Sequence, residues 1–265
     1  MRSIFVGSSH FQGFGLEYEL HPRYQDVLWL EQNGVIGPSK GPRRYSEDEY
    51  LVQQNRWTYL LSQLMGTEEM NVHEHALFGN GNSLKFLDDV YHNIIDLWDV
   101  KNIFLEFNGL TQDGYQRNQN KLIDIQRELK DTDTDDFFAI GKTKIGEFYQ
   151  RLNEVKGKYP NIKFWVINTF GFESELFRDL FKGDILEYYG RDGKNYKSVL
   201  DGCYQDKHFL SDSCFCFNST YPTWDYVVDD IHMNGKGHEY IASMYFLQIT
   251  NPSSIINYEE GKTFI

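Results

Sequence analysis

The alternation of strand-like and helix-like segments is the feature that most constrains the fold of this 265-residue chain. Residues 4–6, 102–107 and 163–168 are short segments rich in large apolar side chains, which is typical of buried strands. Longer segments between them repeat apolar residues every three or four positions, which is the spacing of one helix face. Strands that alternate with helices predict a parallel sheet covered on both faces, so we expect an α/β fold.

The other expected elements follow from apolar spacing and from residues that begin or end helices. Ser83 suits a helix N-cap, and Gly66 suits the residue that follows a helix. The helix that begins at Ser83 should carry Ile94 and Trp98 on its inner face. We expect further strands at residues 71–76 and 185–188, and helices at residues 46–65, 83–98, 137–158, 174–181 and 237–249.

The length of the chain suits a single α/β domain with insertions, spanning residues 1–265. Residues 16–44 and 190–226 lack regular apolar spacing and contain many loop-forming residues, so we predict that they are loop insertions. The acidic run at residues 131–136 is predicted to be a solvated loop and not a metal site.

The charge of the chain argues against a nucleic-acid partner. There are 26 Lys and Arg residues against 39 Asp and Glu residues, which gives a net charge of -13. A surface of this charge repels phosphate backbones. The three cysteines lack the spacing of metal ligands, and we interpret them as structural or incidental thiols. We expect no metal and no cofactor.

The first residues, Met-Arg-Ser, run directly into a strand-like segment. No stretch of about 18 or more apolar residues occurs, so we expect neither a signal peptide nor a membrane partner. The expected site of folding is a cytoplasm, and later release as part of a virus particle is compatible with it. The frequent Asn, Asp and Tyr residues suit a phage-encoded protein.

Two short segments at opposite ends of the chain contain the residue types of a catalytic triad with a serine nucleophile. Ser8 and Ser9 follow the first strand, where a hydroxyl can reach the edge of the sheet. A serine hydroxyl needs a base, and the base needs an orienting partner. His232 is the candidate base, and Asp229, three residues before it, is the candidate partner. Asp230 is the rival partner.

Two further segments offer hydrogen-bond donors for an oxyanion. The turn at residues 78–83 contains Gly79 and Gly81, whose backbone N–H groups can face a ligand. Asn108 follows the 102–107 strand and offers a side-chain amide. His73 and His75 alternate on one strand without an apparent third ligand, so a structural role is favoured over a metal pair. His238 is expected to pack or to cap a helix.

These segments resemble the four blocks of the SGNH (GDSL-type) hydrolase superfamily, which contribute a serine, a glycine, an asparagine and a histidine in that order. The matching segments are Gly-Ser-Ser-His-Phe-Gln-Gly at residues 7–13, residues 76–82, residues 106–109, and the Asp-x-x-His segment that begins at Asp229. Together they span nearly the whole chain. Two residues depart from the family pattern: Ser8 replaces the usual aspartate, and Glu106 replaces a usual glycine.

The resemblance implies roles for five residues. Ser9 is the nucleophile, favoured over Ser8 by its spacing to the later glycine of its block, with His232 as base and Asp229 as orienter. The oxyanion hole consists of the Ser9 and Gly79 backbone N–H groups and the Asn108 side chain. The implied fold is a three-layer α/β/α sandwich with a parallel flavodoxin-like sheet.

The expected activity is hydrolysis of a carboxyl ester through an acyl-enzyme, without a metal. Aromatic residues in the long loops, including Tyr221 and Trp224, suit a sugar ring, so a small-molecule or glycan ester is the expected substrate, with O-acetyl groups favoured. Packing of the loops is the other interpretation of these aromatics. A non-catalytic module of the same fold, binding carbohydrate or serving a larger assembly, is the alternative function.

Overall fold

A computed structural model provides the structure of the chain. It describes residues 1–7, 11, 16, 52–72, 83–107, 134–169, 174–190, 194–196, 198–199, 202, 233 and 235–251. The chain divides into two compact units that interleave along the sequence. Unit 1 takes its residues from 1–8, 67–188 and 196–201, and unit 2 from 9–66, 189–195 and 202–265. The expectation of a single domain stays a prediction.

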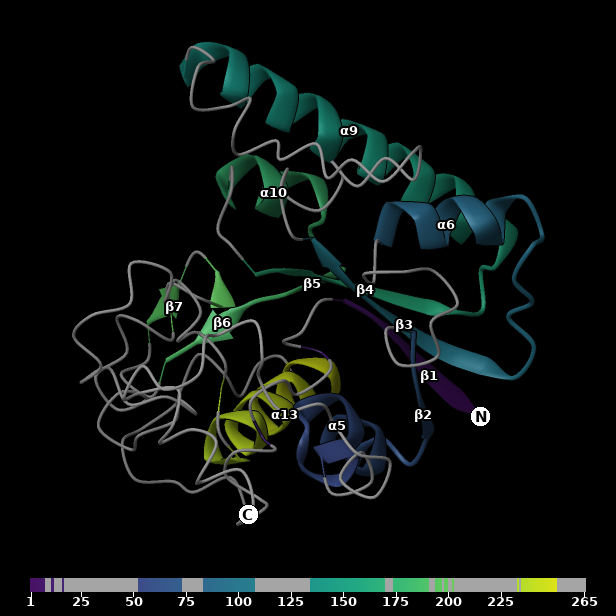
Figure 1. Cartoon of the computed structure of the whole chain (residues 1–265), viewed down its shortest axis with the longest axis vertical. Coiled ribbons are helices and arrows are strands. Elements are labelled where there is room, and N and C mark those ends of the chain that lie inside the picture. The colour runs from purple at the N-terminus through teal and green to yellow at the C-terminus, as the bar shows by residue number, and fades with distance from the viewer. Residues whose placement is uncertain are drawn as a thin grey trace, which may run out of the picture. The chain divides into compact units, whose positions relative to one another are not determined.

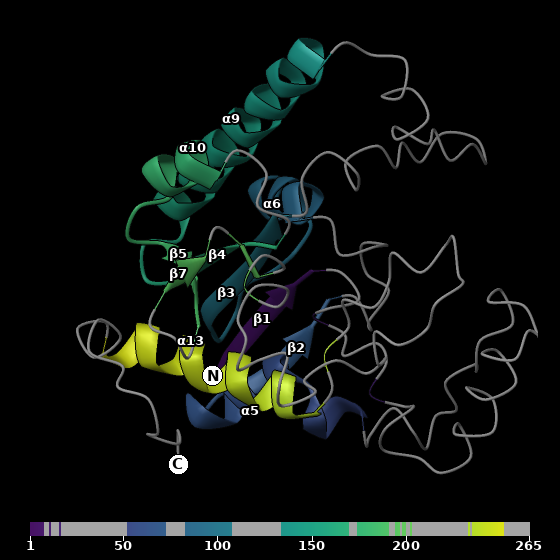
Figure 2. The same cartoon turned by 90° about the vertical axis from the view of Figure 1, so that its left-hand side faces the viewer.

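Unit 1 is built on a five-stranded sheet in which every pair of neighbouring strands is parallel. The strands are β1 (Arg2–Val6), β2 (Glu68–Asn71), β3 (Val100–Phe107), β4 (Lys163–Asn168) and β5 (Ile185–Leu186). Their order across the sheet is β2-β1-β3-β4-β5, so β1 lies between β2 and β3 (Figure 2). This is one of the common strand orders of open α/β sheets. The α/β prediction is confirmed.

Three helices of unit 1 lie on one side of this sheet: α6 (Ser83–Tyr91), α9 (Thr134–Lys158) and α10 (Ser174–Leu180) (Figure 1). The core beneath them consists of alternate strand residues and the inner face of α9, namely Ile4, Val6, Ile103, Leu105, Phe107, Phe164, Val166, Ile145, Phe148 and Leu152. Burial of one such side chain contributes roughly 1.5–3 kcal/mol to stability. Ile145, Phe148 and Leu152 thus form the inner face of α9.

The intervening strand residues belong to the opposite face of the sheet; those of β1 and those of β3 from Asn102 onward are buried as well, whereas Trp165 on β4 is half-buried. Phe5 and Phe104 are 0% exposed, and their rings stack with centroids 4.5 Å apart. Ile167 on β4 is also buried. Burial on both faces explains why the sequences of β1, β3 and β4 are almost continuously apolar.

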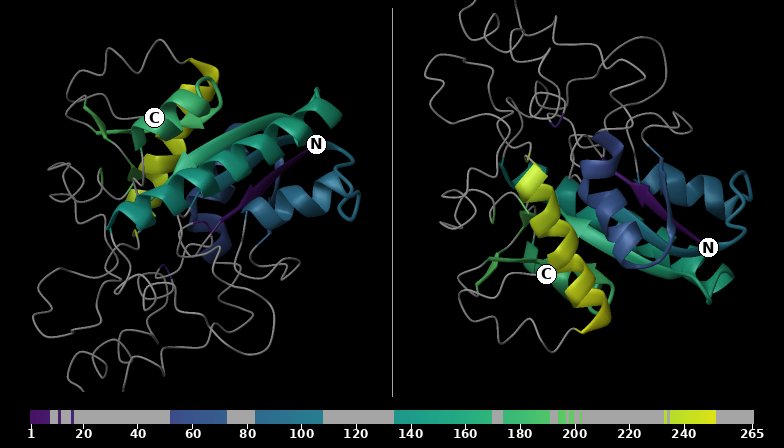
Figure 3. Two further views of the ribbon diagram at one scale, coloured as in Figure 1. Left: turned by 90° about the horizontal axis from the view of Figure 1, so that it is seen from above. Right: turned by 90° about the horizontal axis from the view of Figure 1, so that it is seen from below.

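Unit 2 contains two helices that pack against each other, α5 (Trp57–Leu64) and α13 (Gly235–Thr250) (Figure 3). The rings of Trp57 and Tyr245 meet edge to face with centroids 5.4 Å apart. Arg56, the N-cap residue of α5, provides no side-chain hydrogen bond to the helix. Instead, His238 Nδ1 accepts a hydrogen bond from the Trp57 backbone N–H at 3.1 Å. His238 thus packs and caps, as expected, and satisfies an N–H that a helix start leaves without an intrahelical partner.

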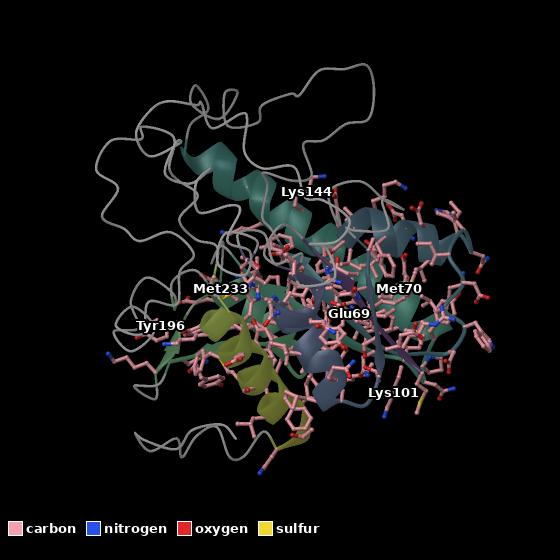
Figure 4. The ribbon with its side chains drawn as sticks, turned by 60° about the horizontal axis from the view of Figure 1, so that its bottom comes forward. Glu69, Met70, Lys101, Lys144, Tyr196 and Met233 are labelled. Carbon is pink, nitrogen blue, oxygen red and sulfur yellow. The ribbon has the colours of Figure 1, made fainter. Side chains whose placement is uncertain are left out.

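The second strand differs from its prediction. It was expected at residues 71–76, but β2 covers Glu68–Asn71, and Val72 is in a turn. β2 lies at the edge of the sheet, and its central residues Glu69 and Met70 are only half-buried (Figure 4). β2 is covered less completely than β1, so it can hold the polar residues Glu68 and Glu69. The apolar pattern therefore missed it.

The helix that begins at Ser83 is shorter than predicted. α6 ends at Tyr91, and Asn93 has a φ of 57°, which a continuing helix cannot contain. Ile94 and Trp98 are each 71% exposed and are not on an inner face. Helical spacing of apolar residues continues past the point where the backbone turns, so the sequence pattern overestimated the length.

Most other expected helices and strands are confirmed, with shifted ends. α9 begins at Thr134, so the last residues of the acidic run 131–136 are helical and not in a loop. Acidic residues are favourable at a helix start because of the helix dipole. The strand expected at 185–188 divides into β5 and a part of β6 (Tyr188–Tyr189), which pairs with β7 (Asn195–Tyr196) in a separate sheet.

The predicted insertions at 16–44 and 190–226 lie largely outside the described residues, as does the start of the helix predicted at 46–65. The end of that helix is as expected: Gly66 follows α5 with a φ of 65°. Within the described part of the chain, no helix has the length and apolar character needed to cross a membrane.

The conformation of Gly66 yields a first prediction. An added Cβ at Gly66 meets nothing within 4 Å, so its cost comes from the left-handed backbone alone. We expect Gly66→Ala to lower the free energy of unfolding by about 1 kcal/mol. Gly146, inside α9, is equally open. Gly146→Ala should raise stability by about 0.5–1 kcal/mol, because alanine is the better helix former.

Urea unfolding of both variants measures this pair of effects. A Gly66→Ala protein as stable as the wild type would contradict the assignment of a strained backbone to this position.

Candidate functional site

The carboxyl ends of β1 and β3 form the region of the sheet where a ligand site is expected. The chain leaves β1 toward β2 on one side and leaves β3 toward β4 on the other, so the strand order reverses between them. Open parallel sheets bind ligands beyond the carboxyl ends of the strands at such a point. Gly7, the buried residue after β1, and Phe107, the last residue of β3, border this region.

The predicted site residues lie outside the described residues. These are Ser9, Gly79, Asn108, Asp229 and His232, together with their rivals Ser8, Gly81 and Asp230. Their described neighbours in the sequence are Gly7, which precedes Ser8, Phe107, which precedes Asn108, Ser83, which follows Gly79 by four residues, and Met233, which follows His232. Met233 is buried (Figure 4). The roles of the predicted residues therefore stay predictions.

Ser83 connects α6, β1 and β3 at the carboxyl ends of the two strands. As the first residue of α6, it directs its hydroxyl toward the ends of β1 and β3. Ser83 Oγ donates to the Glu106 carbonyl oxygen at 2.8 Å and lies 3.3 Å from the Val6 carbonyl oxygen. The single hydroxyl proton is shared between two acceptors or alternates between them. Ser83 is 6% exposed, so its hydroxyl forms its hydrogen bonds with these carbonyls in the interior and not with bulk water.

Thr169 makes a second link at the same edge, between β4 and β3. Its Oγ1 donates to Glu106 Oε1 at 2.6 Å, and its backbone N–H donates to the Phe107 carbonyl oxygen at 3.4 Å. Glu106 and Thr169 are each 2% exposed. A carboxyl group at that depth is costly unless it is hydrogen-bonded, and Thr169 supplies one such bond.

Glu106 stands in the sequence as a replacement for a family glycine, and no motif marks Thr169. Glu106 is nevertheless a charged residue inside the apolar segment Ile-Phe-Leu-Glu-Phe. Such a residue in a buried strand requires a polar partner. The sequence does not identify that partner, because Thr169 is 63 positions further along the chain.

A different polar cluster lies toward the amino ends of the strands. Ser3 Oγ and Thr67 Oγ1 are 2.8 Å apart, and Asn102 Nδ2 donates to Ser3 Oγ at 3.4 Å. All three residues are buried. These side chains form hydrogen bonds with one another at the amino ends of the strands, which lie opposite the predicted site. We therefore assign the cluster a structural role.

A surface groove between α6 and α9 is lined by Leu84, Asp88, Glu147, Gln150, Arg151 and Glu154. Arg151 Nε contacts Asp88 Oδ1 at 2.6 Å, and Arg151 Nη1 contacts Glu154 Oε2 at 2.7 Å. Partly exposed ion pairs of this kind contribute little to stability. In the part of the chain that the structure describes, no group of three or more His, Cys, Asp and Glu side chains is arranged to hold a metal ion.

Comparison with known proteins adds no relative: no family model, no curated protein and no solved structure matches this chain.

The Ser83 hydroxyl yields a second prediction. We expect Ser83→Ala to lower the free energy of unfolding by about 1–3 kcal/mol, because two buried carbonyls lose their shared donor. Thr143→Ala is the control: Thr143 Oγ1 donates to the Ala139 carbonyl within one exposed turn of α9. Its effect should stay within about 0.5 kcal/mol. Denaturant unfolding compares the two, and equal effects would show that Ser83 does not link the strands.

Proposed function

We propose that the protein is a serine-dependent carboxyl ester hydrolase of the SGNH type. Ser9 acts as nucleophile, His232 as general base and Asp229 as the residue that orients the base. The main support is the pairing of β1 with β3 at the point where the strand order reverses. From these two neighbouring strands the chain continues directly to Ser9 and to Asn108, the residues that the reaction needs close together.

The finer description of the fold belongs to the same proposal. An SGNH-type α/β/α sandwich of three layers with a flavodoxin-like sheet is supported by the strand order β2-β1-β3-β4-β5, which is the flavodoxin-like order. Burial of strand residues on both faces of the sheet supports it as well. The α6 helix begins at the ends of β1 and β3, four residues after Gly79, which agrees with the family's second block at this edge.

The proposed reaction proceeds in two steps. Ser9 Oγ attacks the acyl carbon while His232 Nε2 takes the hydroxyl proton, and Asp229 stabilises the resulting imidazolium. The Ser9 and Gly79 N–H groups and the Asn108 amide donate hydrogen bonds to the oxyanion. His232 returns the proton to the departing alcohol, which leaves an acyl-enzyme. A water molecule, deprotonated by His232, then attacks the acyl carbon; the bond to Ser9 Oγ breaks, His232 returns the proton to Ser9, and the acid is released.

O-acetyl groups on a glycan are the substrate class that we favour. Tyr221 and Trp224 lie shortly before Asp229 in the sequence, and aromatic rings near a reacting centre suit the apolar faces of a sugar. The alternative is a non-catalytic module that binds carbohydrate or forms part of a larger assembly such as a virus particle. It is favoured by the replacement of the usual aspartate with Ser8.

Labelling of the nucleophile tests the proposal. The wild-type protein should hydrolyse p-nitrophenyl acetate and react with a fluorophosphonate probe, and Ser9→Ala should abolish both activities. Ser8→Ala, the matched control, should retain labelling. Intact-protein mass spectrometry with peptide mapping identifies the labelled residue. A wild-type protein with neither turnover nor labelling would favour the non-catalytic module, and labelling lost only in Ser8→Ala would reassign the nucleophile.

The proposed base predicts how activity depends on pH. Only the neutral imidazole accepts the serine proton, so protonation of His232 removes activity. Turnover should therefore be full above the ordinary range of a histidine pKa, about 6–7, and should fall as pH drops through it. Initial rates of p-nitrophenyl acetate hydrolysis between pH 4 and 8, roughly spanning that range, measure this. Unchanged rates down to about pH 4 would exclude a histidine base. EDTA, as a control, should have no effect.

A further inference from the structure

Thr169 attaches the end of β4 to the last two residues of β3. The paired residues at this end of the two strands are Phe107 and Asn168. Thr169 lies one position beyond that pair, and its N–H and hydroxyl donate to the Phe107 carbonyl and to Glu106 Oε1, respectively. The N–H bond belongs to the last regular pair of the two strands, and the hydroxyl bond adds a side-chain connection beside it.

The residue that follows this attachment on β3 is Asn108, the proposed oxyanion donor. Asn108 lies outside the described residues and directly follows Phe107 in the sequence. The Thr169 bonds therefore hold the carbonyl of the peptide that joins Phe107 to Asn108, and the side chain of Glu106 two positions before Asn108. Ser83 holds the Glu106 carbonyl as well, at 2.8 Å.

We propose that Thr169 and Glu106 are positioning residues for the Asn108 amide. The inference rests on the proposed esterase function. An oxyanion donor is effective only when it is held in place before charge develops on the substrate. Thr169 Oγ1 and Glu106 Oε1 are 2.6 Å apart and almost fully buried, so this bond limits movement of the backbone that leads to Asn108.

The test removes the Thr169 hydroxyl while keeping the shape of the side chain. Thr169→Val should lower kcat for p-nitrophenyl acetate on the order of tenfold, with KM nearly unchanged, because misplacement of a donor affects the transition state more than substrate binding. Thr169→Ser, which keeps the hydroxyl, should restore most of the lost kcat. Fluorophosphonate labelling should slow in the same order.

Thr67→Val is the matched control. Thr67 is also buried, and its hydroxyl is bonded to that of Ser3 at 2.8 Å, toward the amino ends of the same sheet. Thermal unfolding should show losses of stability of similar size for the two valine variants, whereas only Thr169→Val should lower kcat. An equal fall in kcat for both variants would show that the Thr169 bond contributes only to stability, and it would overturn the inference.

Glu106→Gln keeps a side-chain oxygen that can accept the Thr169 hydroxyl. A positioning role predicts kcat close to that of the wild type and an unchanged pH profile. A large loss of kcat with normal stability would overturn the positioning role, because it would mean that the charge of Glu106 takes part in the reaction. If Thr169→Val does not fold, Thr169→Ser and Glu106→Gln still distinguish these outcomes.

The inference and the proposed function fail in different ways. Wild-type protein that is labelled at Ser9, with Thr169→Val labelled equally fast, overturns the inference and leaves the esterase proposal standing. Wild-type protein without labelling or turnover overturns both.

Discussion

Unit 1 depends on the hydrogen-bonded pairing of β1 with β2 on one side and with β3 on the other. β1 is also covered on both faces, as strands of parallel sheets usually are. Ile4 and Val6 accordingly belong to the core beneath the helices, whereas Phe5 stacks on Phe104 at the opposite face. The same pairing brings the carboxyl ends of β1 and β3 together.

At these adjacent ends, side chains add hydrogen bonds to those of the ladder. Ser83, at the start of α6, donates to the Val6 and Glu106 carbonyls, and Thr169, at the end of β4, donates to the Glu106 side chain. Both side chains are buried, so the hydrogen bonds replace water that cannot reach this edge. Buried and hydrogen-bonded strand ends of this kind are a suitable support for residues that must hold a reacting group in one place.

The sequence predicted the strands with the strongest apolar character, β1, β3 and β4, because burial on both faces requires such residues. It misplaced β2, where the polar residues Glu68 and Glu69 occur on an edge strand. It extended α6 too far, because Ile94 and Trp98 continue the helical spacing after the backbone has turned at Asn93. Neither the edge position of β2 nor the left-handed backbone at Asn93 can be recognised from the spacing of apolar residues.

The sequence by itself determined the α/β class, the central strands, and a set of serine, glycine, asparagine and histidine segments in one order along the chain. Local spacing is sufficient for these, because each depends on residues close together in the chain. Only the tertiary structure decided the order of the strands and the partners of Ser83, Glu106 and Thr169. Ser83 meets Val6 across 77 positions and Thr169 meets Glu106 across 63. Contacts over such separations depend on how the whole sheet pairs, which no local pattern specifies.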